Sequence, residues 1–119
     1  MPFRDLSKSL RRNIRDLAAV AHNRELGAEL RRLDDLFSQW RNGQLSPHEL
    51  NDAIHQFHDG PSRHLWNIYT DSDPSLAVAS AIARGVLQDQ EIPAPTAEEL
   101  RAMVAGFSEQ SSERDENDS

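Results

Sequence analysis

The chain has 119 residues, a formal net charge of −7, 37% apolar residues and no cysteine. This length provides one domain's worth of sequence, and the apolar share supports only a thin core. The absence of thiols excludes disulfides, thiolate zinc sites and cysteine nucleophiles, and no apolar run is long enough to span a membrane. We therefore expect a soluble cytoplasmic protein.

Helix-forming residues dominate the chain, and apolar residues recur at spacings of three and four. Valine, isoleucine and threonine are few and never alternate with polar residues, so nothing predicts a strand. The sequence predicts an all-α fold, a small bundle of about five helices. The expected ranges are 5–22, 24–42, 47–58, 62–70 and 74–90, with a sixth, less clearly marked, at 96–107.

Turn residues mark the first boundaries. Ser46 precedes Pro47, and Glu49 follows three residues after the serine, which is the pattern of a capping box at a helix start. Gly43 and Gly60 are expected to end the helices before them, because glycine takes the left-handed conformation without a Cβ penalty.

Later boundaries follow the same logic. Asp73 before Pro74 predicts another helix start, and residues 92–95 read as an extended linker before a capping box that begins at Thr96. Residues 108–119 contain no apolar side chain and are strongly acidic, which predicts a disordered acidic tail.

Two apolar stripes occupy the first forty residues. The first stripe is Leu6, Leu10, Ile14, Leu17 and Ala21. The second stripe is Leu26, Leu30, Leu33, Phe37 and Trp40. The step between them rotates the second stripe by about 140° from the first. Either two helices bend apart near Gly27, or one long helix presents two faces to two partners, in which case its N-terminal half would pack on a second subunit.

The stripes suggest a division of the chain into three parts. We expect a basic amphipathic arm over 1–23, a helical bundle domain over 24–107 and the disordered acidic tail over 108–119. Apolar residues cover about half the circumference of the predicted helix 74–90, so it should be the most buried helix. Its alanines and Gly85 favour close helix approach, in a central element or an oligomer interface.

A cluster of histidines and aspartates lies on the predicted helix 47–58 and just after it. It consists of His48, Asp52, His55, His58 and Asp59. The Asp-x-x-His spacing is similar to that of helical di-iron ligands, but such a site needs a second matching helix, and none is present. A solvated polar face is the expected reading; a polar interface with a partner and a metal site remain alternatives.

No residues are assigned as catalytic, metal-binding or cofactor-binding. The sequence offers no glycine-rich phosphate loop and no nucleophile elbow, so an enzyme is the less favoured class. Residues 38–49 are similar to half of an EF-hand loop, but Glu49 is the only carboxylate among the expected ligands. A simple helical hairpin is therefore expected there.

Charge is unevenly distributed along the chain. Residues 1–33 carry a net +4 and the remainder carries −11. The basic stripe of the first helix is Arg4, Lys8, Arg11, Arg12 and Arg15. Such a stripe can pack on an acidic surface or a second copy, bind nucleic-acid phosphates or lie on an anionic membrane. Asp5 and Asp16 weaken it as a phosphate surface.

A longer string of residues over about 36–93 resembles a group of short uncharacterised bacterial all-helical proteins. The residues that carry the resemblance begin with Trp40, Gly43, Leu45, Glu49, Leu50, Asn51, Ile54, His55, Phe57, His58 and Gly60. The resemblance implies a bacterial origin and a helical fold, and it carries no activity.

The favoured function is that of a protein–protein interaction or oligomerisation module, a homodimer formed through the N-terminal helices. One alternative is a nucleic-acid-associated regulator that uses the basic stripe. A second alternative is a small metal-dependent enzyme centred on Asp52, His55 and His58. No cofactor is expected.

Overall fold

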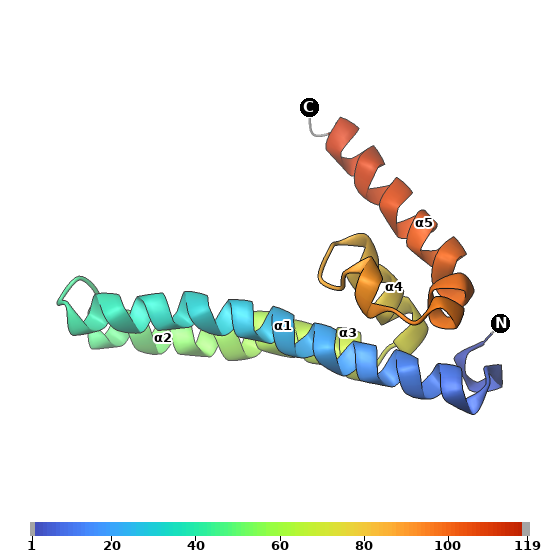
Figure 1. Ribbon diagram of the computed structural model, residues 1–119. Helices are drawn as coiled ribbons and strands as arrows, with labels where there is room; N and C mark the ends of the chain where they lie inside the picture. The colour runs from blue at the N-terminus through green and yellow to red at the C-terminus, as the bar shows by residue number, and fades with distance from the viewer. Residues whose placement is uncertain (1, 118–119) are drawn as a thin grey trace. The chain divides into compact units, whose positions relative to one another are not determined.

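A computed structural model describes the backbone of residues 2–117 and the side chains of residues 2–110 (Figure 1). Within these residues all regular secondary structure is helical and no strand is present, which confirms the all-α class. The α-helices are α1 (Lys8–Arg41), α2 (Pro47–Phe57), α3 (Arg63–Thr70), α4 (Pro74–Ala83) and α5 (Ala94–Asn117). The short turns are 3₁₀-type η1 (Phe3–Asp5), π-type η2 (His58–Ser62) and 3₁₀-type η3 (Asp89–Glu91).

No helix in the described part of the chain combines the length and the apolar character that crossing a bilayer requires. The predicted tail, 108–119, falls mostly outside the side chains that the structure describes, and α5 is assigned through Asn117.

Residues 8–41 form one continuous helix. Of the two arrangements considered, α1 adopts the long helix, which has 34 residues and so extends for about 50 Å. It begins later than the expected residue 5, because the Ser7 hydroxyl accepts the Leu10 amide at 3.2 Å and caps the start. It ends where expected, since Gly43 adopts a φ of +77°.

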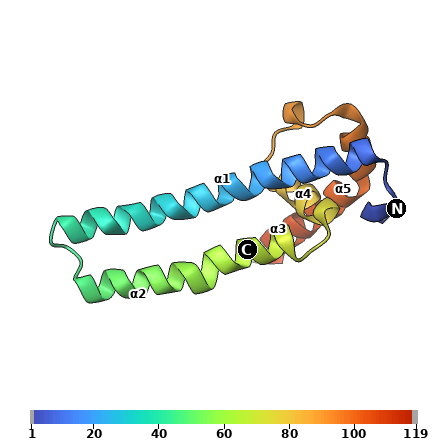
Figure 2. The same cartoon turned by 90° about the horizontal axis from the view of Figure 1, so that it is seen from below.

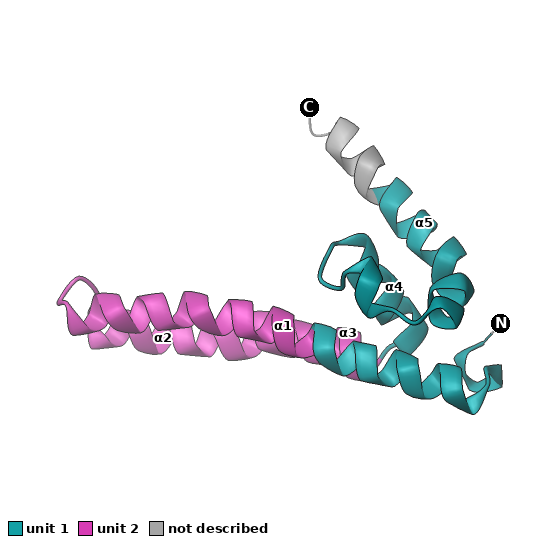
Figure 3. Ribbon diagram, viewed as in Figure 1, with its two compact units in different colours: residues 1–21, 72–119 teal, residues 22–71 magenta. Residues whose placement is uncertain are grey.

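The described chain divides into two compact units (Figure 3). Unit 1 comprises residues 1–21 and 72–119, and unit 2 comprises residues 22–71. Each unit therefore contains one part of α1. This division differs from the predicted arm, bundle and tail, because the N-terminal part of α1 belongs to the same unit as the C-terminal helices.

Unit 1 contains most of the buried apolar side chains. Four of the five residues of the first stripe are buried, and Ile14 and Ala21 are completely inaccessible. Half of the ten residues of α4 are buried, as expected of the most buried helix. The buried residues from the rest of unit 1 include Leu87, Ile92 and Leu100.

Helix α4 is shorter than the predicted 74–90. It starts as expected, with the Asp73 carboxylate accepting the Ser75 amide at 2.8 Å. It ends at Ala83 because Gly85 takes a φ of +79° and the Val86 amide donates back to the Ala81 carbonyl at 2.9 Å. Gly85 thus terminates the helix, and the expectation that it allows close helix approach was wrong.

The start of α5 also differs from the prediction. The helix begins at Ala94, and the Ala97 amide donates to the Pro93 carbonyl at 2.9 Å, so part of the expected extended linker is helical. Thr96 is therefore inside the helix and does not cap it. Its side chain is completely buried, and its hydroxyl accepts from Asn13 Nδ2 at 3.5 Å.

Unit 2 is a helical hairpin. Figures 1 and 2 both show the C-terminal part of α1 running beside α2 and α3. The predicted capping box closes the turn, with Ser46 Oγ accepting the Glu49 amide and Glu49 Oε1 accepting the Ser46 amide, both at 3.1 Å. The second arm of the hairpin continues through η2 into α3.

The junction at η2 corrects one sequence prediction. The backbone does not leave the helical conformation at residues 59–61, and Gly60 is not among the residues with positive φ. Pro61 cannot donate to the preceding turn, and its ring would clash with the carbonyl four residues earlier in a regular α-helix. The wider π turn accommodates the ring, so α2 and α3 continue one another.

Candidate functional site

The second apolar stripe remains accessible in the hairpin. None of its five residues is buried, whereas four of the five in the first stripe are. Leu30 is 46% exposed and Trp40 is 41% exposed. Trp40 meets the ring of Phe37 edge to face, with 6.4 Å between the ring centroids. The hairpin thus keeps a long apolar strip partly in contact with solvent.

Few side chains are buried between the two arms of the hairpin, along the line called here the hairpin seam. Leu50 and Leu65 are the buried apolar residues of unit 2 within the described chain. A two-helix hairpin buries only a narrow line of side chains, because each helix has a single neighbour. The remaining apolar surface of unit 2 therefore lies along the flanks of the seam.

One flank carries a shallow apolar hollow of about 270 Å³. Its apolar lining comes from both arms, with Leu33 and Leu36 on α1 and Ala53 and Phe57 on α2. Charged and polar side chains from both helices also line the hollow. A mixture of apolar and polar lining residues is common in protein–protein interfaces.

The open end of the hairpin is held by a polar and aromatic cluster. The rings of His22 and Tyr69 stack with 5.1 Å between centroids and an interplanar angle of 13°. The Tyr69 hydroxyl donates to Glu25 Oε2 at 2.7 Å. These contacts join α1 to α3 at this end of the hairpin.

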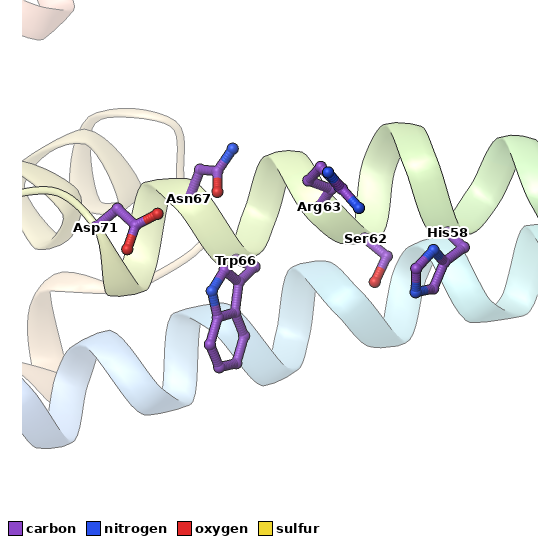
Figure 4. A pocket seen from close by; sticks show the side chains of 6 residues that line it. All are labelled: His58, Ser62, Arg63, Trp66, Asn67 and Asp71. Atoms are coloured by element: carbon purple, nitrogen blue, oxygen red, sulfur yellow. The ribbon is translucent and has the colours of Figure 1, made fainter.

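A groove along η2 and α3 presents Trp66, the most exposed of the tryptophans. It has a volume of about 430 Å³, and its lining residues form two rows along one run of helical backbone (Figure 4). One row is His58, Ser62 and Trp66, and the other is Arg63, Asn67 and Asp71. Within each row the residues are four apart, which is the spacing of the ridges that bound a groove on a helix surface.

Trp66 dominates this groove. Its side chain is 57% exposed, although indole is a large apolar surface that normally avoids water. Tryptophan and arginine are the residues most enriched among the energetic centres of protein interfaces, and Trp66 and Arg63 stand on opposite rows of the same groove.

The predicted histidine and aspartate cluster is solvated. His48, Asp52, His55, His58 and Asp59 are all exposed. Among the five, the contact that the structure describes joins neighbours in sequence, His58 Nδ1 and Asp59 Oδ1 at 3.4 Å, with 73% of each side chain exposed. The pairs one turn apart form no hydrogen bond in the described chain.

In residues 2–110, no three histidine, aspartate or glutamate side chains are close enough to share a metal ion. Asp52, His55 and His58 therefore do not form a shared site here. Glu49, the one carboxylate of the fragment similar to an EF-hand, is occupied by the capping box.

The basic stripe is divided between two elements of unit 1. Arg4 belongs to η1, and Lys8, Arg11, Arg12 and Arg15 lie in the first two turns of α1. All five lie within unit 1, whereas the exposed apolar strip lies in unit 2. The two candidate surfaces therefore belong to different units of the chain.

Sequence reasoning did not single out the groove on α3 or the Tyr69 hydrogen bond. A helical pattern that buries Leu65 turns its neighbour Trp66 away from the hairpin seam. This difference in orientation could have indicated from the sequence that Trp66 is exposed. The pairing of Glu25 with Tyr69 depends on the register of two helices far apart in sequence, which local spacing does not encode.

Comparison with models of known families, with curated proteins and with solved structures finds no match to this chain.

Proposed function

We propose that the protein is a small helical interaction module that forms a homodimer through the hairpin of unit 2. The observation that carries this proposal is the accessibility of the second stripe in a hairpin whose turn is closed by a capping box. An exposed apolar strip along a helix is unfavourable in water and gains free energy when another helix covers it.

A second copy of the hairpin is the occupant that fits this strip. Two helical hairpins that cover each other's open faces form a four-helix bundle, in which every helix has two neighbours. The strict alternation of four and three in the second stripe is the spacing of a helix–helix seam. Residues 22–41 carry four arginines and four acids, so the α1 segments of two copies have no net charge with which to repel each other.

The proposal moves the interface from its expected place. The first stripe, which was expected to be available for dimerisation in a long helix, is covered inside unit 1. The second stripe takes over this role in the proposed dimer. An interface that buries aromatic and leucine side chains at its centre is typical of stable dimers.

The test uses two leucines with almost equal exposure. Leu30, in the second stripe, is 46% exposed, and Leu76, on α4 in unit 1, is 44% exposed. Size-exclusion chromatography with light scattering should give a dimer for the unmodified chain and for Leu76→Glu. Leu30→Glu should run as a monomer, because a carboxylate buried in the dimer interface would lose its hydration without gaining a partner.

The control separates dimerisation from folding. Circular dichroism should show the same helical content for both variants, since each changes a side chain on the surface of a helix. A monomeric unmodified chain at about 100 µM, a concentration far above the Kd of a stable dimer, would contradict the proposal. So would equal dimer fractions for the two variants.

A further inference from the structure

The basic stripe of unit 1 is a second surface, independent of the proposed dimer seam. Arg4, Lys8, Arg12 and Arg15 are exposed, and Arg11 is half-buried. Spacings of three and four place the α1 members of the stripe on one side of the helix, away from the buried first stripe. The only acids among residues 1–21 are Asp5 and Asp16.

Acidic side chains do not neutralise this stripe within the described part of the chain. Among the residues that the structure describes, none of the five cations forms an ion pair, and Asp16 does not pair with Arg12 although it follows one turn later. Elsewhere arginines do find acids one turn away, as in the pairs Arg32 with Glu29 and Arg101 with Glu98. Within the described residues, the charge of the stripe therefore remains available to an anion.

Two members of the stripe are held in place by the fold. The Arg15 guanidinium lies 5.3 Å from the centroid of the Phe3 ring, which is a cation–π contact. The Nε of Arg11 is buried and has no hydrogen-bond partner in the described chain. Held side chains lose less conformational entropy when they bind a ligand than freely rotating ones.

The burial of the first stripe argues against a membrane as the ligand. A basic amphipathic helix binds a bilayer by inserting its apolar face between the lipids. Here Ile14 is completely buried and Leu17 is 8% exposed, so that face is already covered by the chain itself. A soluble polyanion needs only the cationic face, which is open.

The stripe is long enough to span several phosphates of a nucleic-acid backbone. Lys8 and Arg15 are seven residues apart, about 10 Å along the helix, and a nucleic-acid duplex carries a charge for about every 1.7 Å of its axis. The stripe can therefore reach several phosphates at once. It offers no free aromatic ring for stacking on bases, because Phe3 is engaged with Arg15.

We propose that the basic stripe of Arg4, Lys8, Arg11, Arg12 and Arg15 binds the phosphate backbone of a nucleic-acid duplex without reading its sequence. The first turn of α1 adds the partial positive charge of a helix N-terminus to the same surface. Phosphate contacts alone give binding that depends steeply on salt and little on base sequence.

The experiment is a titration of a fluorescently labelled 20-base-pair DNA duplex with the full chain, followed by fluorescence anisotropy. With four to five phosphate contacts, Kd should weaken by about two orders of magnitude between 50 and 200 mM salt. The double variant Arg12→Gln/Arg15→Gln should reduce the slope of log Kd against log salt by about two. A duplex of different sequence should bind within about threefold of the first, since no base contacts contribute.

A matched control removes the same charge from unit 2. Arg31 and Arg41 are exposed residues of α1 outside the stripe, and Arg31→Gln/Arg41→Gln should bind the duplex like the unmodified chain. The proposal is overturned if the duplex does not bind at 50 mM salt, if the two double variants weaken binding equally, or if the chain sediments with phosphatidylserine vesicles and ignores the duplex. Arg12→Gln/Arg15→Gln changes no residue of the second stripe, so loss of dimerisation and loss of DNA binding are separate outcomes for that variant.

Discussion

At the scale of single residues, local signals were reliable where the backbone itself decides the conformation. The Ser46 capping box, the Asp73 cap and the left-handed Gly43 all lie where the sequence predicts them. Such features depend on atoms only a few residues apart. The predictions for Gly60 and Thr96 were wrong because the surrounding helices override what the local pattern favours.

Two glycines of unit 2 provide a test at this scale. Gly43 has a φ of +77°, which an L side chain rarely adopts, whereas Gly27 is in the interior of α1 and has open space where a Cβ would lie. Gly43→Ala should lower the free energy of unfolding by about 1–2 kcal/mol. Gly27→Ala should raise it by about 0.5–1 kcal/mol. Urea titration followed by circular dichroism measures both. A change in the free energy of unfolding of the same sign in both variants would contradict the structure.

A third glycine tests the η2 junction. Gly60 is in a helical conformation, and no atom lies within 4 Å of the position a Cβ would take. Gly60→Ala should therefore stabilise the hairpin by about 0.5–1 kcal/mol, as expected for glycine inside a helix. Loss of stability in the same urea titration would instead support the left-handed helix end that the sequence suggested.

At the scale of elements, periodicity predicted the helices better than the boundaries and connections between them. The all-α class and most of the helices follow from the spacing of apolar residues, and the early end of α4 follows from Gly85 once its φ is known. Whether Gly27 bends α1 could not be decided from sequence, because glycine permits both a bend and a straight helix. The choice depends on what each half of α1 packs against.

The two stripes of α1 should respond differently to truncation. Ile14 is completely buried, so Ile14→Ala should cost about 2–5 kcal/mol of unfolding free energy. Leu30 is 46% exposed, and in dilute monomer Leu30→Ala should cost less than about 1 kcal/mol. Urea unfolding at low protein concentration compares them directly. Similar losses would mean that the second stripe is as well covered as the first.

At the scale of the whole molecule, the charge and the apolar surface are separated between the two units. Unit 1 holds most of the buried core and the basic stripe, and unit 2 holds the exposed apolar strip. The sequence indicated both surfaces through the spacing of their residues. It could not show which stripe the chain covers with its own helices, because that depends on contacts between distant segments.

The central claim is that two copies of the chain meet along the second stripe. Because the chain has no cysteine, a nitroxide label on the exposed Arg31→Cys variant gives spin pairs only between copies. Double electron–electron resonance should detect a defined intermolecular distance that disappears when Leu30→Glu is added. A signal that shows only an unmodulated background for the labelled chain at about 100 µM, far above the Kd of a stable dimer, would contradict the account.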